Sequence, residues 1–282
     1  MGMIAFTSVD FRLAAWAIIG FTAFASPAAA QDRPDLEKRP TFEERPATIF
    51  MVGIGPALKP QYPGADSSRL SASPIVNVWR DGERMPAETA DEGAGFVVVG
   101  KRGKLAAGVA LSVATGRKGR DIAPGLADVG FGIEAGGFIE TYPLPGLRLR
   151  GELRQSIGAH KGLVADALID LVLRQPDDRL VITVGPRLRW GNERFQRAYF
   201  GVSAAGAAAS GLPAYNPGSG IHAYGAMTGA YYQFDHKWGL FGFAGYDRLT
   251  GAAARSPIVV QTGSRNQIST GLALTYRFTI RR

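Results

Sequence analysis

The chain of 282 residues contains no cysteine, which excludes disulfide bonds and thiolate metal sites. Its three histidines, His160, His222 and His236, lie in or beside turns and lack the close spacing of a metal-binding pair. After residue 30, no window approaches about 18 apolar residues without a charge, so no transmembrane helix is expected there. No amphipathic helix is evident from Thr48 onward either. We therefore expect a chain built from strands.

Catalytic and nucleotide-binding motifs are also weak. Gly53 and Gly55 are followed by Pro56 and lack the third glycine of a dinucleotide site, and no Walker A spacing is present. A hydrolase could still assemble a Ser/His/acid group in space around His160 or His222, although no sequence feature favours it. We expect no catalytic residue, no metal site and no cofactor.

The first 30 residues have the order of a secretory signal peptide. Arg12 precedes an apolar run at residues 13–24, and the small residues 28–30 form a cleavage site before Gln31. A transmembrane anchor would need about 20 apolar residues, and this run is shorter. We expect cleavage after Ala30 and export to the outer membrane.

Residues 31–46 mix both charge signs with prolines and have only Leu36 and Phe42 as sizeable apolar side chains, so a flexible periplasmic tether is expected. The formal charge of the chain is +8. In a cytosolic protein that charge would suggest nucleic acid, but export makes outer-membrane lipid, lipopolysaccharide or an anionic cell-wall polymer the natural counter-charge.

Residues 271–280 show the strand pattern most clearly. Leu272, Leu274 and Phe278 fall on one face, whereas Ala273 and Arg277 fall on the other. The apolar face could pack on a soluble core, or it could face lipid while Arg277 points into a barrel lumen. Four further segments alternate in the same way, each with one apolar and one charged face: residues 129–140, 147–157, 163–174 and 180–190.

Turn lengths favour the barrel. Short turns near residues 143–146, 175–178 and 235–237 alternate with long loops at about 116–128, 192–220 and 251–264. Short turns on one rim and long loops on the other are typical of an outer-membrane barrel, with the short turns in the periplasm. Aromatic residues that would form its girdles lie towards strand ends: Trp190, Trp238, Tyr142, Tyr246 and Tyr276.

We therefore predict an all-β fold, a transmembrane antiparallel up-and-down β-barrel formed by residues 47–282. The final strand should pair with the first, residues 48–56, so that no edge remains. The sequence offers 11 strand candidates, but two periplasmic termini require an even number. One segment, near residues 85–92 or 199–202, is therefore expected to be miscounted, which gives 12 strands, or else 10.

The charged strand faces would line the barrel interior. Opposite charges there should pair across neighbouring strands, so we expect a paired polar interior rather than a conducting pore. If a pore exists, the arginine excess would favour anions. The candidate lumen charges are Glu134, Arg148, Arg150, Glu152, Arg154, Asp166, Asp170, Arg187, Arg189 and Arg277.

A set of short motifs runs in order along the chain. They are GIGPALKPQYPGAD at residues 53–66, SPI at 73–75, GR at 116–117, AYFGVS at 198–203, SGLPAYN at 210–216, Leu249 with SPIV at 256–259, and STGLALTYRF at 269–278. Together they resemble the MipA/OmpV family, the MltA-interacting outer-membrane proteins. The chain departs from the usual family ending, because residues 279–282 follow Phe278 where relatives commonly stop at the aromatic residue.

The resemblance implies an outer-membrane barrel without established catalytic residues. For some members it implies a scaffold that holds a periplasmic lytic transglycosylase together with a peptidoglycan synthase, a bifunctional penicillin-binding protein. A non-enzymatic scaffold is therefore the expected function, and a small channel with a charged, arginine-rich lumen is the alternative.

The loop at residues 194–220 is too long for a mere connection. It could brace the barrel mouth or form a ligand site, and long ordered loops often do both. Its candidate residues are Tyr199, Phe200, Gly201, Gly211, Leu212, Pro213, Tyr215 and Asn216.

Overall fold

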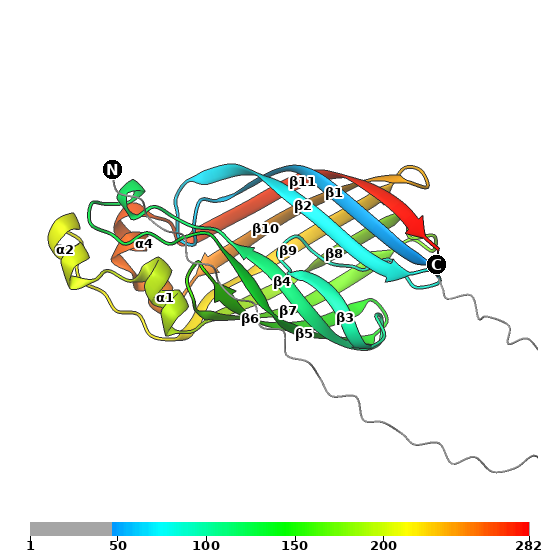
Figure 1. Cartoon of the computed structure of the whole chain (residues 1–282), viewed down its shortest axis with the longest axis horizontal. Coiled ribbons are helices and arrows are strands. Elements are labelled where there is room, and N and C mark those ends of the chain that lie inside the picture. Colours follow the sequence, from blue (N-terminus) through cyan, green and yellow to red (C-terminus); the bar gives the residue numbers. More distant parts are fainter. Residues whose placement is uncertain (1–46, 282) are drawn as a thin grey trace, which may run out of the picture. The chain divides into compact units, whose positions relative to one another are not determined.

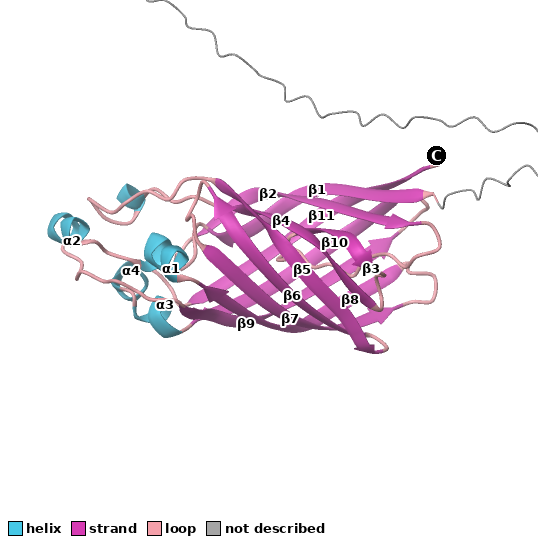
Figure 2. Ribbon diagram, turned by 60° about the horizontal axis from the view of Figure 1, so that its bottom comes forward, coloured by secondary structure: helices cyan, strands magenta, loops and turns pink. Residues whose placement is uncertain are grey.

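A computed structural model describes residues 47–281 of the chain, which form one antiparallel sheet that curls into a barrel (Figures 1 and 2). The signal peptide and the tether expected at residues 1–46 lie outside the described residues. The strands are β1 (Thr48–Pro60), β2 (Ser68–Arg80), β3 (Ala94–Gly100), β4 (Leu105–Ala114), β5 (Gly132–Leu144), β6 (Leu147–Ile157), β7 (Leu163–Arg174), β8 (Leu180–Gly191), β9 (Gly220–Gln233), β10 (Trp238–Leu249) and β11 (Asn266–Ile280).

The first and last strands lie side by side, as the sequence predicts. β1 pairs antiparallel with β11, with Thr48 opposite Ile280 and Phe50 opposite Phe278. The rings of Phe50 and Phe278 stack with centroids 5.3 Å apart. The full order of the sheet is β2-β1-β11-β10-β9-β8-β7-β6-β5-β4-β3. Within the described residues β2 and β3 end the sheet without pairing with each other, so the expectation that no edge remains is wrong, because the parallel direction of these two strands does not continue the antiparallel ladder.

Burial follows the alternation of the sequence. Along β6, Arg148, Arg150 and Arg154 are buried, because successive side chains of a strand point to opposite faces. The outward residues on neighbouring strands stay exposed although they are apolar: Ile139 is 57% exposed and Leu153 50%. The barrel thus has an apolar outside and a charged inside along this wall.

The strand count differs from the expected 12, since 11 strands are described in residues 47–281. Every neighbouring pair in the order is antiparallel, so β2 and β3, at its two ends, run in the same direction. The connection between them must therefore return along the barrel before β3 begins. Residues 85–92 belong to this connection and are not a strand, and Tyr199 and Phe200 end a helix.

The long loops contain helices, contrary to expectation: α1 (Glu193–Phe200), α2 (Ala204–Ser210), α3 (Gly251–Arg255), α4 (Pro257–Thr262) and the 3-10 turn η1 (Gly119–Asp121). They gather at one end of the barrel, and the short turns lie at the other (Figure 1). Within the described chain, none of the helices has the length and apolarity needed to cross a membrane.

Helix α1 shows why these elements were missed. Asn192 caps it, since its side chain accepts a hydrogen bond from the backbone N–H of Phe195. The helix has only eight residues, too short for periodicity to stand out, and such a short helix depends on tertiary packing.

Candidate functional site

The charged wall of the interior is built by β5 to β8. Neighbouring strands place their inward residues opposite each other, with Arg148 beside Asp170 across β6 and β7 and Asp166 beside Arg189 across β7 and β8. Cross-strand neighbours of opposite charge attract, so the register itself pairs arginine with carboxylate. Nine of the ten candidate lumen charges lie in this wall.

Arg148 occupies the centre of the network and is 0% exposed. Its Nη2 lies 2.5 Å from Glu92 Oε2 and its Nε 2.7 Å from Glu140 Oε2. Its Nη1 lies 3.1 Å from Asp170 Oδ2. A buried charge is tolerated when it is paired and hydrogen-bonded, and this guanidinium meets three carboxylates.

The network continues towards the helical end through Arg154. This guanidinium pairs with Glu134 at 3.0 Å and Asp166 at 2.6 Å, and also with Glu152. Glu134 in turn contacts His160, with Nε2 to Oε1 at 2.9 Å, while His160 Nδ1 accepts a hydrogen bond from Gly162. Both ring nitrogens of His160 are therefore occupied.

The β2–β3 connection enters the interior and supplies further carboxylates. Asp91 Oδ2 lies 2.9 Å from both Arg187 Nε and Arg189 Nη2. Glu88 pairs with Arg102 at 2.8 Å. We call residues 85–92 the luminal segment. Its main chain is also held, because Arg148 Nη1 donates to the carbonyl of Ala87 at 3.0 Å.

The sequence analysis did not predict that the luminal segment forms ion pairs with the arginines of β6 and β8. A signal was present, since residues 81–93 hold five acidic residues and one arginine, opposite a wall in which arginine is prominent. Local sequence does not say on which side of a sheet a loop runs, so this acidity looks the same as that of a solvated turn.

The opposite wall of the interior is apolar. Met51 of β1, Trp79 of β2, and Phe241 and Phe243 of β10 form a buried cluster there, and Met85 of the luminal segment packs against it. The luminal segment therefore lies between an apolar wall, which Met85 contacts, and an arginine-rich wall, with which Asp91 and Glu92 form ion pairs.

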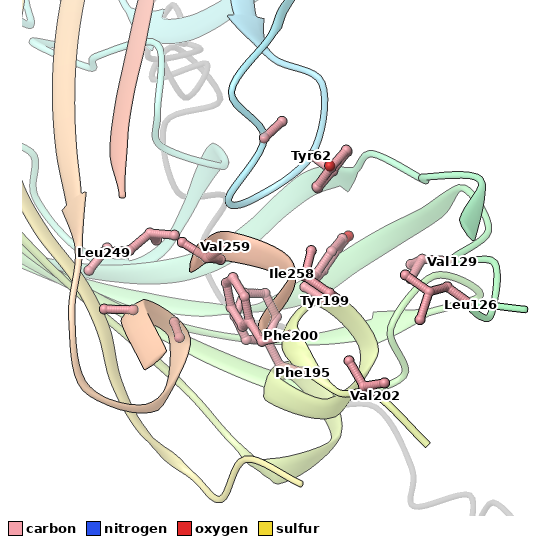
Figure 3. Packing of buried hydrophobic residues seen from close by; sticks show 14 of the residues in the cluster. Tyr62, Leu126, Val129, Phe195, Tyr199, Phe200, Val202, Leu249, Ile258 and Val259 are labelled. Carbon is pink, nitrogen blue, oxygen red and sulfur yellow. The ribbon is translucent and has the colours of Figure 1, made fainter. Parts of the chain in front are cut away.

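A helical cap covers the other end of this interior. Phe195, Tyr199 and Phe200 of α1 pack with Ile258 and Val259 of α4 in one buried cluster (Figure 3). Figure 3 also shows Tyr62, Leu126 and Val129 contributed by other loops at this end. We call this cluster the cap.

The candidate loop residues serve the cap. Tyr199 donates its hydroxyl to the carbonyl of Thr115 at 2.8 Å, and Tyr215 donates to Ala252 at 2.8 Å. Gly211 ends α2 with φ 75°, a conformation that favours glycine. The remaining candidates lie around these contacts: Phe200 and Leu212 are buried, Gly201 ends α1, Pro213 is exposed, and Asn216 Oδ1 accepts from Arg197 Nε at 2.5 Å.

Arg117 lies beneath the cap, with its guanidinium 5.7 Å from the centre of the Tyr62 ring. It donates to the carbonyl of Ala198 at 3.0 Å. Burial lowers the pKa of Arg117 and raises the pKa of the Tyr62 hydroxyl. These groups join the loops to one another.

The other chemistry-bearing residues are dispersed. Arg277 lies apart from the network and donates to the carbonyl of His236 at 3.3 Å on the exposed short-turn end. His222 is buried against Phe195, with ring centroids 4.6 Å apart. Within residues 47–281, no three His, Asp or Glu residues are arranged to hold a metal ion.

Comparison with known proteins identifies the family. The family described as MltA-interacting protein MipA matches residues 52–278. The chain belongs to the MipA family. Its motif residues Tyr62, Arg117, Tyr199 and Ile258, far apart in sequence, meet at the cap. Four separate segments of the chain thus pack together at one place.

Two MipA-family relatives are the MltA-interacting proteins of Escherichia coli K12 and Shigella flexneri. Each is 35% identical over 105 residues, which is 37% of this chain and 41% of the relative. The chain thus aligns with less than half the length of these relatives.

Solved structures with lower similarity include a bacterial polysaccharide outer membrane secretin, at 9% identity and TM-score 0.34, covering 83% of this chain and 99% of that one. A TodX monoaromatic hydrocarbon channel mutant matches at 8% identity and TM-score 0.34, covering 85% and 91%. The outer membrane protein OprG of Pseudomonas aeruginosa matches at 7% identity and TM-score 0.23, covering 83% and 97%.

Proposed function

We propose that this MipA-family barrel is an outer-membrane scaffold that binds a periplasmic lytic transglycosylase and, through it, a peptidoglycan synthase. The family description names interaction with MltA, and this supports a binding role. The apolar outer face supports placement in a membrane, because exposed apolar bands of this kind face lipid in transmembrane barrels.

The observation that carries the choice of scaffold over channel is the luminal segment. It lies in the interior between the two walls, and Asp91 and Glu92 neutralise arginines that a conducting anion path would leave free. Displacing it would break several buried ion pairs at once, which costs several kcal/mol.

Catalysis finds no support in the same interior. A histidine that acts as general base needs a ring nitrogen within reach of its substrate, and both ring nitrogens of His160 are engaged. His222 is buried against Phe195, away from any substrate in solution. Substituting His160 or His222 by alanine should therefore abolish no turnover of lipid or peptide substrates.

Co-purification tests the scaffold. The full-length protein, solubilised from envelopes in mild detergent after light crosslinking, should retain a transglycosylase of the MltA type. Absence of any transglycosylase after crosslinking would contradict the proposal.

A small channel is the second candidate, favoured by the arginine wall. Planar-bilayer recordings of the refolded wild-type protein should give a flat trace at both polarities. A steady anion-selective conductance would favour the channel instead.

Export and outer-membrane placement are tested together. Membrane fractionation should find the chain with the outer membrane, and amino-terminal sequencing should begin at Gln31. A chain that retains residues 1–30 would contradict cleavage at this site.

A further inference from the structure

A large pocket opens at the short-turn end of the barrel, away from the cap. Its volume is about 820 Å³, within the range of small-molecule and peptide sites. Four segments form it: residues 82–86, the β3–β4 turn, the β5–β6 turn and the end of β7. We call it the short-turn pocket.

The edge of the short-turn pocket carries cations that the fold leaves unpaired. Arg84, Lys101 and Lys104 line it and are exposed, and none forms an ion pair with another residue in the range 47–281. Among the other charges of the lining, Arg102 binds Glu88, Arg174 lies 3.4 Å from Asp178 and Glu140 pairs with Arg148. Glu83 forms no ion pair within residues 47–281, so three unpaired cations stand against one unpaired carboxylate at this pocket.

The floor and one side of the pocket are apolar. Tyr142, expected in an outer girdle, instead faces this mouth and packs against the interior apolar cluster. Leu144, the last residue of β5, is 60% exposed between Pro143 and Pro145. Proline fixes the backbone dihedral φ, so this side is a rigid apolar edge beside the exposed lysine side chains.

We propose that the short-turn pocket docks an acidic segment of the periplasmic protein partner, with one apolar side chain placed against Tyr142 and Leu144. The inference rests on the proposed function and names the surface that performs it. Unpaired cations around an apolar floor attract a chain that carries carboxylates and an apolar anchor.

The location agrees with this occupant. Short turns of an outer-membrane barrel face the periplasm, where a transglycosylase is found, whereas the cap lies at the opposite end. The exposed cations Arg84, Lys101 and Lys104 would mainly increase the rate of association with an acidic partner and make that rate depend on salt.

The test compares two charge reversals that change the net charge equally. K101E/K104E alters the short-turn pocket, and K118E/R120E alters exposed cations of the β4–β5 loop at the cap end. Binding of the MltA-type transglycosylase from the same organism to each full-length, detergent-solubilised variant is measured at low and high salt. The shift of the folded band on unheated gels checks that both variants fold.

K101E/K104E should weaken binding about tenfold or more at low salt, through slower association, and should flatten the salt dependence. K118E/R120E should bind like the wild type. A glutamate-rich peptide with one leucine should compete with the transglycosylase, and a lysine-rich peptide should not.

Equal affinities and salt slopes for the two variants would overturn the pocket assignment and leave the scaffold standing. Failure of the wild type to bind any transglycosylase would overturn both. Loss of binding to purified peptidoglycan, with transglycosylase binding unchanged, would assign the pocket to the cell-wall polymer and overturn the proposal.

Discussion

Arg148 is the residue of the interior whose loss should cost the most stability, because it forms three buried ion pairs. It is fully buried and meets Glu92, Glu140 and Asp170, which come from the luminal segment, β5 and β7. One guanidinium thus links three parts of the chain. Replacing every member of such a buried ion-pair network by apolar residues often leaves the free energy of unfolding nearly unchanged. Removing only one partner lowers it strongly, because the other charge stays buried without a counter-ion.

We expect Arg148→Leu to destabilise the barrel by about 3–5 kcal/mol, since three carboxylates lose their shared counter-ion. Reversible urea unfolding in lipid vesicles measures the change. Arg197→Leu is the matched control, because Arg197 pairs with Glu193 on the exposed surface of α1, where such pairs contribute about 0–1 kcal/mol. Equal effects of the two substitutions would contradict the buried network.

Among the elements, the luminal segment and the cap close the interior in different ways. The luminal segment is held by ion pairs and main-chain contacts, and the cap by aromatic packing between α1 and α4. The luminal segment and the cap share no side chains, so each can be altered by substitution without changing the other.

Replacing residues 85–92 by glycine and serine of equal length, in a chain that also carries Phe200→Ala to loosen the cap, should open an ionic path. Arg148, Arg187 and Arg189 would lose carboxylate partners, so the conductance should prefer anions. Planar-bilayer recording compares this variant with one in which residues 203–210, around α2, are replaced in the same way. A silent luminal variant that folds would show that another part of the chain blocks the lumen.

Phe200→Ala should loosen the cap without unfolding the barrel. Phe200 is fully buried, and removing a buried phenylalanine costs about 3–5 kcal/mol. Limited proteolysis should cut within residues 193–262 faster than in the wild type, whereas Val260→Ala, at an exposed position of α4, should leave the rate unchanged. Unchanged cleavage in Phe200→Ala would argue for a ligand-site role of this loop over bracing.

For the whole molecule, the main feature is that exposed apolar side chains cover the outside of the sheet while buried ion pairs line one wall of the interior. Large apolar side chains, Leu153 among them, are exposed on every described strand from β1 to β11. An apolar surface of this kind on a monomer in water would promote aggregation, so the fold requires lipid or detergent around it.

Leu153→Arg, near the middle of β6, should destabilise the protein in a bilayer by about 2–4 kcal/mol, because the charge would enter the hydrocarbon. Ile157→Arg places the same side chain at the end of β6, where the cost falls to about 0–1 kcal/mol. Unfolding in vesicles separates the two. A neutral Leu153→Arg would contradict burial of this face in lipid.

The sequence predicts the wall of the barrel well and its contents poorly. The alternation in residues 147–157 identifies both faces of β6, and the pairing of the first and last strands follows from closure. Asp91 and Glu92 could not be placed, because their partners lie far away in the chain and the local pattern is that of an ordinary polar loop. Helix α1 could not be seen either, since its stability comes from Ile258 and Val259 in another loop.

The position of β1 beside β11 also bears on the order in which the barrel assembles. Strands β3 to β11 each pair with a sequence neighbour and can form as successive hairpins, whereas the β1–β2 hairpin joins the sheet only through β11. We expect that hairpin to dock last and to enclose the luminal segment as it does so, in a slow, long-range step. A chain ending at Ser264 should therefore leave residues 48–80 open to protease while the middle of the sheet stays protected.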